Sequence, residues 1–190
     1  MADLKEQSLD LVVESAIEQK IKVAILFPDS ETVDSVIKIA KKNHQQPEEQ
    51  QLKLLGSHDL YYCNVLKQGE QAVKGLILAV PWFKGMPEAE NFSTEVKNRW
   101  GGEVSWLTAA SYDATQAFIY ALSNSGKNPS RSRVLQKVKD VNLPANKTSG
   151  ENLSFSSGEK REGKAILVEV VESSLNPDCS DLDFSQVGEQ

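Results

Sequence analysis

The sequence predicts an α/β protein in which a parallel β-sheet is flanked by helices and completed by a C-terminal β-hairpin. Short apolar runs alternate with helical patterns along the first 80 residues, and such alternation is typical of parallel strands joined by right-handed crossovers. The apolar run that ends at Pro81-Trp82 is followed by a mainly helical region. A strand that stops at a proline before a differently patterned region predicts a crossing between two lobes.

The first 80 residues are predicted to form, in order, a helix, a strand, a second helix, a second strand, a short helix and a third strand. Apolar residues spaced three and four apart from Leu9 to Ile17 predict the first helix, with Ser8 as its N-cap. The run Ile21–Phe27 is almost continuously apolar, which predicts a strand covered on both faces. The elements expected next are a helix capped by Ser30 around Val33–Ala40, a strand at Leu52–Leu55, a short helix at Leu60–Lys67 and a strand at Leu76–Val80.

The rest of the chain is expected to be helical and then extended. Helices are predicted at Phe92–Trp100, Ala109–Ser123 and from Pro129 onward, and Thr148–Gly150 is expected to be a linker. Leu153 and Phe155 alternate with polar residues, a glycine-bounded turn follows at Gly158–Gly163, and Ala165–Val171 forms a longer strand. These two strands predict a hairpin that joins the main sheet. Residues 176–190 are acidic and aperiodic, which predicts a flexible tail.

The overall composition excludes several classes of function. The formal net charge is −6 and the pI is about 5.1, whereas nucleic acids and anionic membranes require basic surfaces. The N-terminus has no signal-peptide pattern, so the chain is expected to be cytoplasmic, or a mature or truncated piece. Cys63 and Cys179 lie far apart in the sequence, which argues against a redox motif or zinc site. Two thiols are expected in preference to a disulfide.

The motifs of the common enzyme classes are missing from the sequence. There is no GxGxxG, GxxxxGK[ST], HExxH or GxSxG. Only His44 and His58 are available for a histidine-based triad or metal site, and His44 falls in a polar loop. We therefore expect no catalytic residues, no metal and no cofactor.

Polar residues follow the first two predicted strands. Asp29 and Ser30 come after the first strand, and His58 and Asp59 come after the second. Because ligand groups collect at the carboxyl ends of parallel strands, these residues form the candidate site. Two alternatives remain for Asp29. It caps the next helix together with Ser30, or it is a phospho-acceptor in a flavodoxin-like signalling or enzyme domain that uses Asp29 and His58.

Several segments in order resemble the C-terminal part of type I periplasmic binding proteins, above all the branched-chain amino acid group of ABC transporters. The most specific are the SYDATQAFIYAL helix and the hairpin motif made by Asn152, Leu153, Phe155, Gly158, Arg161 and Gly163. The resemblance runs from about Leu9 to Glu172. It implies an incomplete version of a fold with two Rossmann-like lobes and a ligand between them.

The resemblance also implies a division of the chain. Residues 1–80 would end the second lobe, residues 81–149 would return to the first lobe, and residues 150–175 would form a second-lobe hairpin before the tail. It implies a periplasmic or extracellular protein, an amino-acid-like ligand and a membrane permease as partner of the parent protein. Cleft closure without enzymatic activity is the expected mechanism.

Individual site residues follow from the same resemblance. The cleft position after the first strand falls on Asp29 or Ser30. The turn that usually supplies an acid for the ligand's ammonium has His58 in the acid's place, followed by Asp59. An apolar cleft contact before the Tyr112 helix falls on Trp106 or Leu107. Since the absent part of the first lobe would normally cover the helix Ala109–Ser123, we also expect self-association and weak binding of free amino acids.

Overall fold

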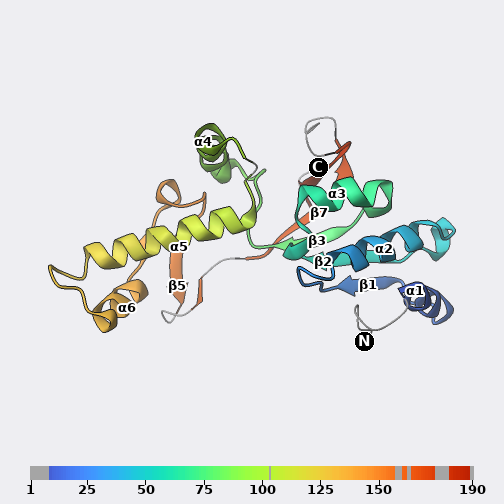
Figure 1. Cartoon of the computed structure of the whole chain (residues 1–190), viewed down its shortest axis with the longest axis horizontal. Helices are drawn as coiled ribbons and strands as arrows, with labels where there is room; N and C mark the ends of the chain where they lie inside the picture. Colours follow the sequence, from blue (N-terminus) through green and yellow to red (C-terminus); the bar gives the residue numbers. More distant parts are fainter. Residues whose placement is uncertain (1–8, 103, 157–159, 162–163, 174–179, 189–190) are drawn as a thin grey trace. The chain divides into compact units, whose positions relative to one another are not determined.

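The computed structural model describes residues 9–102, 104–156, 160–161, 164–173 and 180–188. The chain divides into two compact units (Figure 1). Unit 1 comprises residues 1–80 and 166–190, and unit 2 comprises residues 81–165. The chain therefore passes between the units at two points, Val80–Pro81 and Ala165–Ile166.

Unit 1 is built on a five-stranded sheet in the order β1-β2-β3-β7-β8. The strands β1 (Val23–Leu26), β2 (Lys53–Ser57) and β3 (Ile77–Val80) are parallel, as predicted. The strands β7 (Ile166–Glu172) and β8 (Leu182–Gln186) extend the sheet in antiparallel fashion. The sheet is thus mixed, with its parallel part formed by the first 80 residues.

Helices bury one face of this sheet. The helices of unit 1 are α1 (Leu9–Glu18), α2 (Val33–His44) and α3 (Cys63–Gly69), together with the short 3₁₀ helices η1 (Glu48–Gln50), η2 (His58–Leu60) and η3 (Glu70–Val73). Alternate strand residues such as Leu54, Leu78 and Val168 are buried on the covered face. Tyr61 and Phe184 close this core with ring centroids 4.6 Å apart.

The opposite face of the sheet is exposed, contrary to the prediction for the first strand. Val23, Ile25 and Phe27 alternate with covered residues and are 45%, 61% and 75% exposed. The expectation that Ile21–Phe27 is covered on both faces is therefore wrong. A continuous apolar run predicts two apolar faces, but it cannot say whether another element covers each of them.

Among its described residues, unit 2 has three α-helices, two short 3₁₀ helices and a small sheet. Its elements are η4 (Pro87–Ala89), α4 (Glu90–Trp100), α5 (Trp106–Ser123), α6 (Arg131–Lys139) and η5 (Ala145–Lys147), with strands β4 (Asn142–Leu143), β5 (Leu153–Ser156) and β6 (Lys160–Arg161). Helix α4 ends at Gly101, which is left-handed with φ +69°, a common way for a helix to end. Ala117 of α5 packs in a core with Val141 and Leu153.

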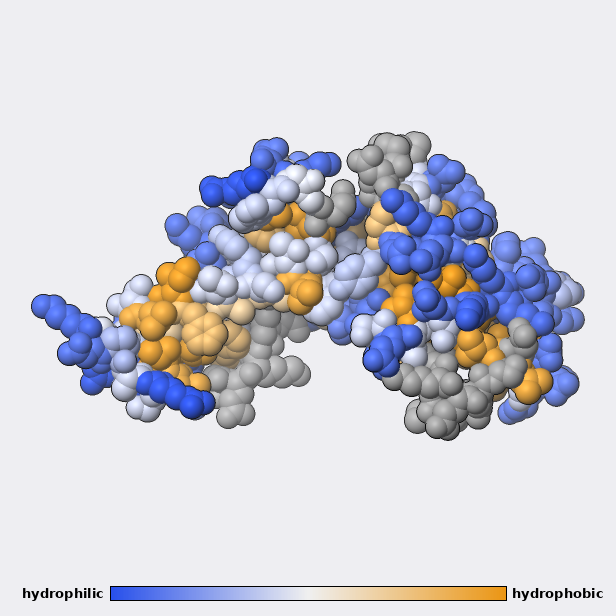
Figure 2. Space-filling view, in the orientation of Figure 1, coloured by the Kyte–Doolittle hydropathy of each residue, from blue (hydrophilic) through white to orange (hydrophobic). Residues whose placement is uncertain are grey.

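Only part of the predicted buried face of α5 is confirmed. Ala109, Asp113, Ala117 and Ala121 are the buried residues of this helix. The small and apolar residues of this helix predict a buried face made of Ala110, Ala114, Ala117, Phe118 and Ala121. Phe118 is instead 57% exposed, and Ile119 and Leu122 are about half exposed. Figure 2 shows hydrophobic residues gathered over α5 and α6. The helix therefore presents an apolar surface that nothing within the described part of unit 2 covers.

A buried polar cluster fixes the segment before β5. The carboxylate of Asp113, 1% exposed, accepts hydrogen bonds from the backbone N–H of Ser149 (2.7 Å) and from its hydroxyl (2.8 Å). The indole Nε1 of Trp82 donates to the Ser149 carbonyl at 3.0 Å. Thr148, Ser149 and Gly150 are all buried. The expectation that these three residues form a linker is wrong, because they are a central part of the unit 2 interior.

The C-terminal strands differ from the predicted hairpin. Leu153–Ser156 pairs with β4 and β6 in the small sheet of unit 2, and Ile166–Glu172 pairs with β3 and β8 in unit 1. The prediction that Leu153–Phe155 joins the main sheet is therefore wrong, and the second division of the chain lies at residues 165/166 instead of 149/150. The predicted flexible tail contains strand β8. Ser8 and most of the Gly158–Gly163 turn lie outside the described residues.

The prediction of two thiols is also wrong for Cys63. This residue is disulfide-bonded, and the other cysteine of the sequence, Cys179, lies outside the described residues. Cysteine spacing alone could not predict the bond, because a disulfide depends on which residues the fold brings together.

Candidate strand-end binding site

Two of the predicted pairs of site residues follow neighbouring parallel strands of unit 1. Strands β1 and β2 pair in register from Val23↔Lys53 to Leu26↔Gly56. Asp29 and Ser30 follow the end of β1, and His58 and Asp59 follow the end of β2. The four residues therefore lie beyond the same edge of the sheet, where α/β proteins collect ligand contacts. We refer to them as the strand-end cluster.

The turn after β1 holds Asp29 by its own hydrogen bonds. Its Oδ1 accepts from the backbone N–H of Glu31 (3.0 Å) and from the hydroxyl of Thr32 (2.8 Å). The backbone N–H of Asp29 donates to the same hydroxyl at 2.9 Å. Helix α2 has Thr32 at its N-cap position, so the predicted N-cap role of Ser30 is wrong. Asp29 instead orders the turn that precedes the helix and leaves Ser30 exposed.

The turn after β2 places a carboxylate beside two potential donors. The hydroxyl of Ser57 donates to Asp59 Oδ2 at 3.2 Å. The Nε2 atom of His58 lies 3.9 Å from Asp59 Oδ1, and both side chains are more than a third exposed. This part of the cluster can thus accept a hydrogen bond from a ligand's ammonium and donate one to a ligand's carboxylate.

A glycine in β2 determines where this turn lies. Gly56 is buried, and a Cβ atom added there would lie 2.6 Å from Leu60 Cδ1 and 2.9 Å from Leu78 Cδ2. The absence of a side chain lets the fully buried Leu60 pack against the strand. Since Leu60 ends η2, this contact anchors the short helix that carries His58 and Asp59.

The third predicted pair belongs to unit 2. Trp106 and Leu107 begin helix α5, whose N-cap residue Ser105 accepts a hydrogen bond from the backbone N–H of Thr108 at 3.3 Å. Trp106 is partly buried, whereas Leu107 is 53% exposed. The structure brings the residues of the strand-end cluster to one edge of unit 1, and it places this apolar pair at a helix terminus of the other unit.

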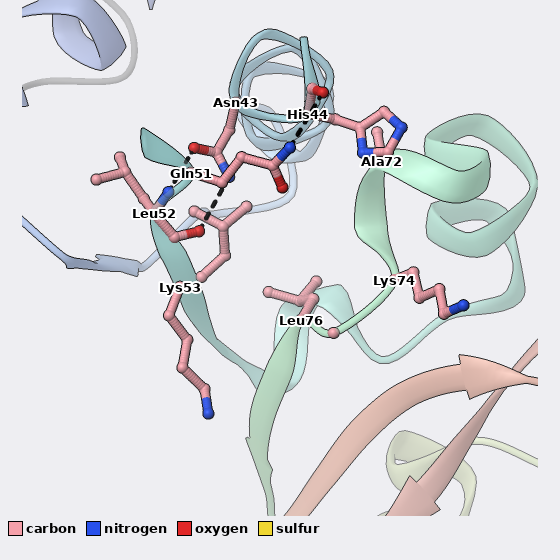
Figure 3. A pocket seen from close by; sticks show the side chains of 10 residues that line it. Asn43, His44, Gln51, Leu52, Lys53, Ala72, Lys74 and Leu76 are labelled. Carbon is pink, nitrogen blue, oxygen red and sulfur yellow. Dashed lines mark hydrogen bonds between the residues drawn. The ribbon is translucent and has the colours of Figure 1, made fainter. Parts of the chain in front are cut away.

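The described structure has two hollows, one in each unit, that the sequence patterns did not predict. The hollow of unit 1 (Figure 3) measures about 260 Å³ and lies at the amino ends of β2 and β3, near Lys53 and Leu76. Its wall includes the buried amide of Asn43, which bonds the backbone of Leu52 at 2.8 and 2.9 Å. The hollow of unit 2, about 420 Å³, lies between α4 and α5 beside Tyr112 and Trp100. Neither contains a residue of the strand-end cluster.

The described part of the chain shows no metal centre. Its His, Cys, Asp and Glu side chains form no group of three that could hold a metal ion. Nor does any helix in the described ranges have the length and apolar character needed to cross a membrane.

Comparison with known proteins identifies the family to which this fold belongs. The family model "Periplasmic binding protein" matches residues 3–174. The chain therefore belongs to the periplasmic binding protein family. The resemblance of the helix and hairpin motifs to this family is thereby confirmed. A search of curated protein sequences finds no match.

Solved structures show the same fold over about half of their length. A leucine-binding protein from Thermotoga maritima has a TM-score of 0.73 at 15% identity, with 95% of this chain and 48% of that chain covered. An ABC transporter substrate-binding protein from Sphaerobacter thermophilus has a TM-score of 0.75 at 15% identity, with 97% and 49% covered. A Rhodopseudomonas palustris solute-binding protein in complex with benzoate has a TM-score of 0.72 at 12% identity, with 99% and 47% covered.

Proposed function

We propose that this chain is part of a non-enzymatic solute-binding protein of an ABC transporter or a sensory receptor. The strand-end cluster would supply polar contacts to the ligand. The observation that carries this proposal is the position of Asp29, Ser30, His58 and Asp59 beyond one edge of the unit 1 sheet, in a chain of this family.

The chemistry of the cluster supports a small carboxylic acid as ligand. The similar structures include a leucine-binding protein and a complex with benzoate, and both compounds carry a carboxylate. In this chain His58 can donate a hydrogen bond to such a group, and the Asp59 carboxylate beside it can pair with an ammonium. An amino acid or a similar small polar acid therefore fits the cluster.

The division of the chain supports a mechanism of cleft closure. We assign unit 1 to the second lobe of the family fold and unit 2 to the first lobe. The end of strand β3 at residues 80/81 and the start of strand β7 at residues 165/166 would then be the hinge positions. Trp106 and Leu107 would provide an apolar contact from the first lobe, which excludes water from the bound ligand.

A periplasmic or extracellular location and a membrane permease partner complete the proposal. The family is one of periplasmic proteins. The disulfide at Cys63 supports this location, because disulfides persist in oxidising compartments and are rare in the cytosol.

The proposal predicts weak and selective binding by this chain. Leucine, glutamate and benzoate should each bind with a dissociation constant of about 1 mM or weaker, because the chain spans half of the solved binding proteins. Calorimetry should therefore show little heat, and NMR titration should measure the affinity. His58→Ala should weaken all three ligands by about threefold or more, whereas Asp59→Asn should weaken only the two that carry an ammonium.

Asp34→Asn is the matched control, because Asp34 is an exposed acid in the first turn of α2 and lies outside the cluster. It should leave all three affinities unchanged. Equal losses for Asp34→Asn and Asp59→Asn, or a loss of benzoate binding in Asp59→Asn, would contradict the proposed roles.

A second prediction separates binding from phosphoryl transfer. If Asp29 were a phospho-acceptor, acetyl phosphate and Mg²⁺ would add about 80 Da to the protein. We expect no adduct, because Asp29 Oδ1 already accepts two hydrogen bonds within its turn. Mass spectrometry of the intact protein measures this directly. A stoichiometric adduct that disappears in Asp29→Asn would favour the signalling alternative.

A further inference from the structure

The hollow of unit 1 lies at the opposite end of the sheet from the strand-end cluster. Lys53 begins β2 and lines the hollow, whereas His58 and Asp59 follow the other end of the same strand. Its volume of about 260 Å³ is close to the lower limit for pockets that hold small molecules. The hollow can therefore hold a small ligand without any contribution from the strand-end cluster.

The walls of the hollow come from elements that are already packed against one another. All lining residues lie within residues 43–76, at the end of α2, at the start of β2, in η3 and just before β3. Strand β2 pairs with β1 and β3, and β3 pairs with β2 and β7. Since neither strand has an unpaired edge, the hollow is a gap between packed elements and not an uncovered side of the sheet.

Buried side chains fix the shape of the hollow. Leu52, Leu54 and Leu76 are 6%, 5% and 2% exposed. The amide of Asn43 donates to the Leu52 carbonyl at 2.9 Å and accepts from the Leu52 backbone N–H at 2.8 Å, which holds the start of β2 against α2. The hollow is therefore largely preformed, as is usual for small-molecule sites.

The titratable residues that line the hollow are all basic. They are His44, Lys53 and Lys74, and no Asp or Glu belongs to the lining within the described part of the chain. Figure 3 shows Lys53 and Lys74 on opposite sides of Leu76. The whole chain, by contrast, has a formal net charge of −6. A concave surface with one sign of charge attracts ligands of the opposite sign.

The C-terminus of α2 at the margin of the hollow does not cancel this positive charge. Free carbonyl groups at the end of a helix carry a partial negative charge. The carbonyl groups of residues 41–44, however, all accept hydrogen bonds. Their donors are the backbone N–H groups of Gln45 and Gln46 and the side-chain amides of Gln46 and Gln51.

Two glutamates of β7 compete with an anionic ligand for the basic residues. Glu172 Oε1 lies 2.6 Å from Lys74 Nζ, and the Glu172 side chain is 64% exposed. Glu169 Oε1 lies 4.0 Å from the position that a Cβ atom would occupy at Gly75. Because an ammonium has three N–H groups, Lys74 can donate to Glu172 and to a ligand at the same time. A ligand with more than one negative charge competes best.

We propose that the hollow of unit 1 binds a small multivalent oxyanion such as inorganic phosphate. Lys53 and Lys74 donate to its oxygens from two sides, and His44 supplies a further donor. Several oxygens on one centre allow these donors to bind the same ion together. The site is separate from the proposed solute site, because the two lie at opposite ends of β2.

NMR titration of the ¹⁵N-labelled whole chain with inorganic phosphate tests this inference. Saturable shifts at residues 43–44, 51–53 and 74–76 should give a dissociation constant of about 1–10 mM at low salt. The affinity should fall about threefold or more at about 0.2 M NaCl, because exposed charges are screened. Acetate, which carries a single charge, should bind about fivefold more weakly or worse. The absence of saturable shifts at these residues would overturn the inference.

Charge variants separate recognition of the anion from effects on the fold. Lys53→Gln and Lys74→Gln should each weaken phosphate binding about threefold or more, whereas Glu172→Gln should strengthen it about twofold, since it removes a competing charge. Lys38→Gln is the matched control, because Lys38 is an exposed lysine of α2 outside the lining, and it should leave the affinity unchanged. Weaker binding in Glu172→Gln, or equal losses in Lys38→Gln and Lys53→Gln, would overturn the inference.

Discussion

Replacement of Gly150 by alanine should destabilise unit 2 by about 3 kcal/mol or more. Gly150 adopts φ +129°, a backbone conformation that residues with a side chain rarely adopt. An added Cβ would also lie 2.7 Å from the Glu88 carbonyl oxygen and 2.8 Å from the Ala89 backbone. Because these are backbone atoms, no side-chain rotation can relieve the contact, and the segment from Thr148 to Gly150 must move.

Tryptophan fluorescence during urea unfolding measures this effect. All three tryptophans of the chain, Trp82, Trp100 and Trp106, belong to unit 2, so their signal reports on that unit. Gly102→Ala is the matched control, since no atom lies within 4 Å of an added Cβ and its φ is not positive. The control should unfold like the wild type. A Gly150→Ala variant with an unchanged midpoint would contradict the close packing of this turn.

Replacement of Asp113 by alanine should have a similar effect, a loss of about 3 kcal/mol in the free energy of unfolding of unit 2. The carboxylate accepts two hydrogen bonds from Ser149, which is 0% exposed. Without it, the backbone N–H and the hydroxyl of Ser149 lose their acceptors in a site that water does not reach. Asp113→Asn should cost less, because its amide oxygen still accepts one of the two bonds.

Asp140→Ala is the control for this substitution. Asp140 is also an aspartate of unit 2, and it pairs with Lys137 at 2.8 Å on the surface. Surface ion pairs contribute about 1 kcal/mol or less, so this variant should unfold close to the wild type in the same urea experiment. Equal losses in the free energy of unfolding for Asp113→Ala and Asp140→Ala would contradict a stabilising role for the buried hydrogen bonds between Asp113 and Ser149.

The three parallel strands of unit 1 could be predicted from the sequence because each contains a short apolar run between turn residues. Ile21–Phe27 and Leu76–Val80 contain β1 and β3, and Leu52–Leu55 overlaps the first part of β2, which continues to Ser57. The exposure of Ile25 could not be predicted. In a run where both faces are apolar, burial depends on which elements lie above and below the sheet.

Partners of the later strands were harder to predict than the strands themselves. Leu153–Ser156 pairs with the two-residue strands Asn142–Leu143 and Lys160–Arg161, and segments this short have no detectable alternation. The burial of Ser149 likewise depends on Trp82 and Asp113, which lie 67 and 36 residues away in the sequence. A polar, glycine-containing segment looks like a linker until such distant partners are known.

The positions of the candidate site residues beyond the strand ends could be predicted from the sequence, but their hydrogen bonds could not. The positions of Asp29 and Asp59 beyond strand ends follow from the alternation of strands and helices. Their hydrogen bonds do not, because Thr32 rather than Ser30 occupies the N-cap position of α2. The resemblance to periplasmic binding proteins could be seen in the helix and hairpin motifs, and the family match over residues 3–174 confirms it.

The proposal that the strand-end cluster binds the ligand is tested most directly by finding which residues show NMR changes when a ligand is added. Backbone amide resonances of the ¹⁵N-labelled chain would be followed while leucine or benzoate is added to millimolar concentration. We expect saturable chemical-shift changes at Asp29, Ser30, His58 and Asp59, beyond the ends of β1 and β2. Saturable shifts confined to the hollow at the amino ends of β2 and β3, or to the hollow between α4 and α5, would contradict it.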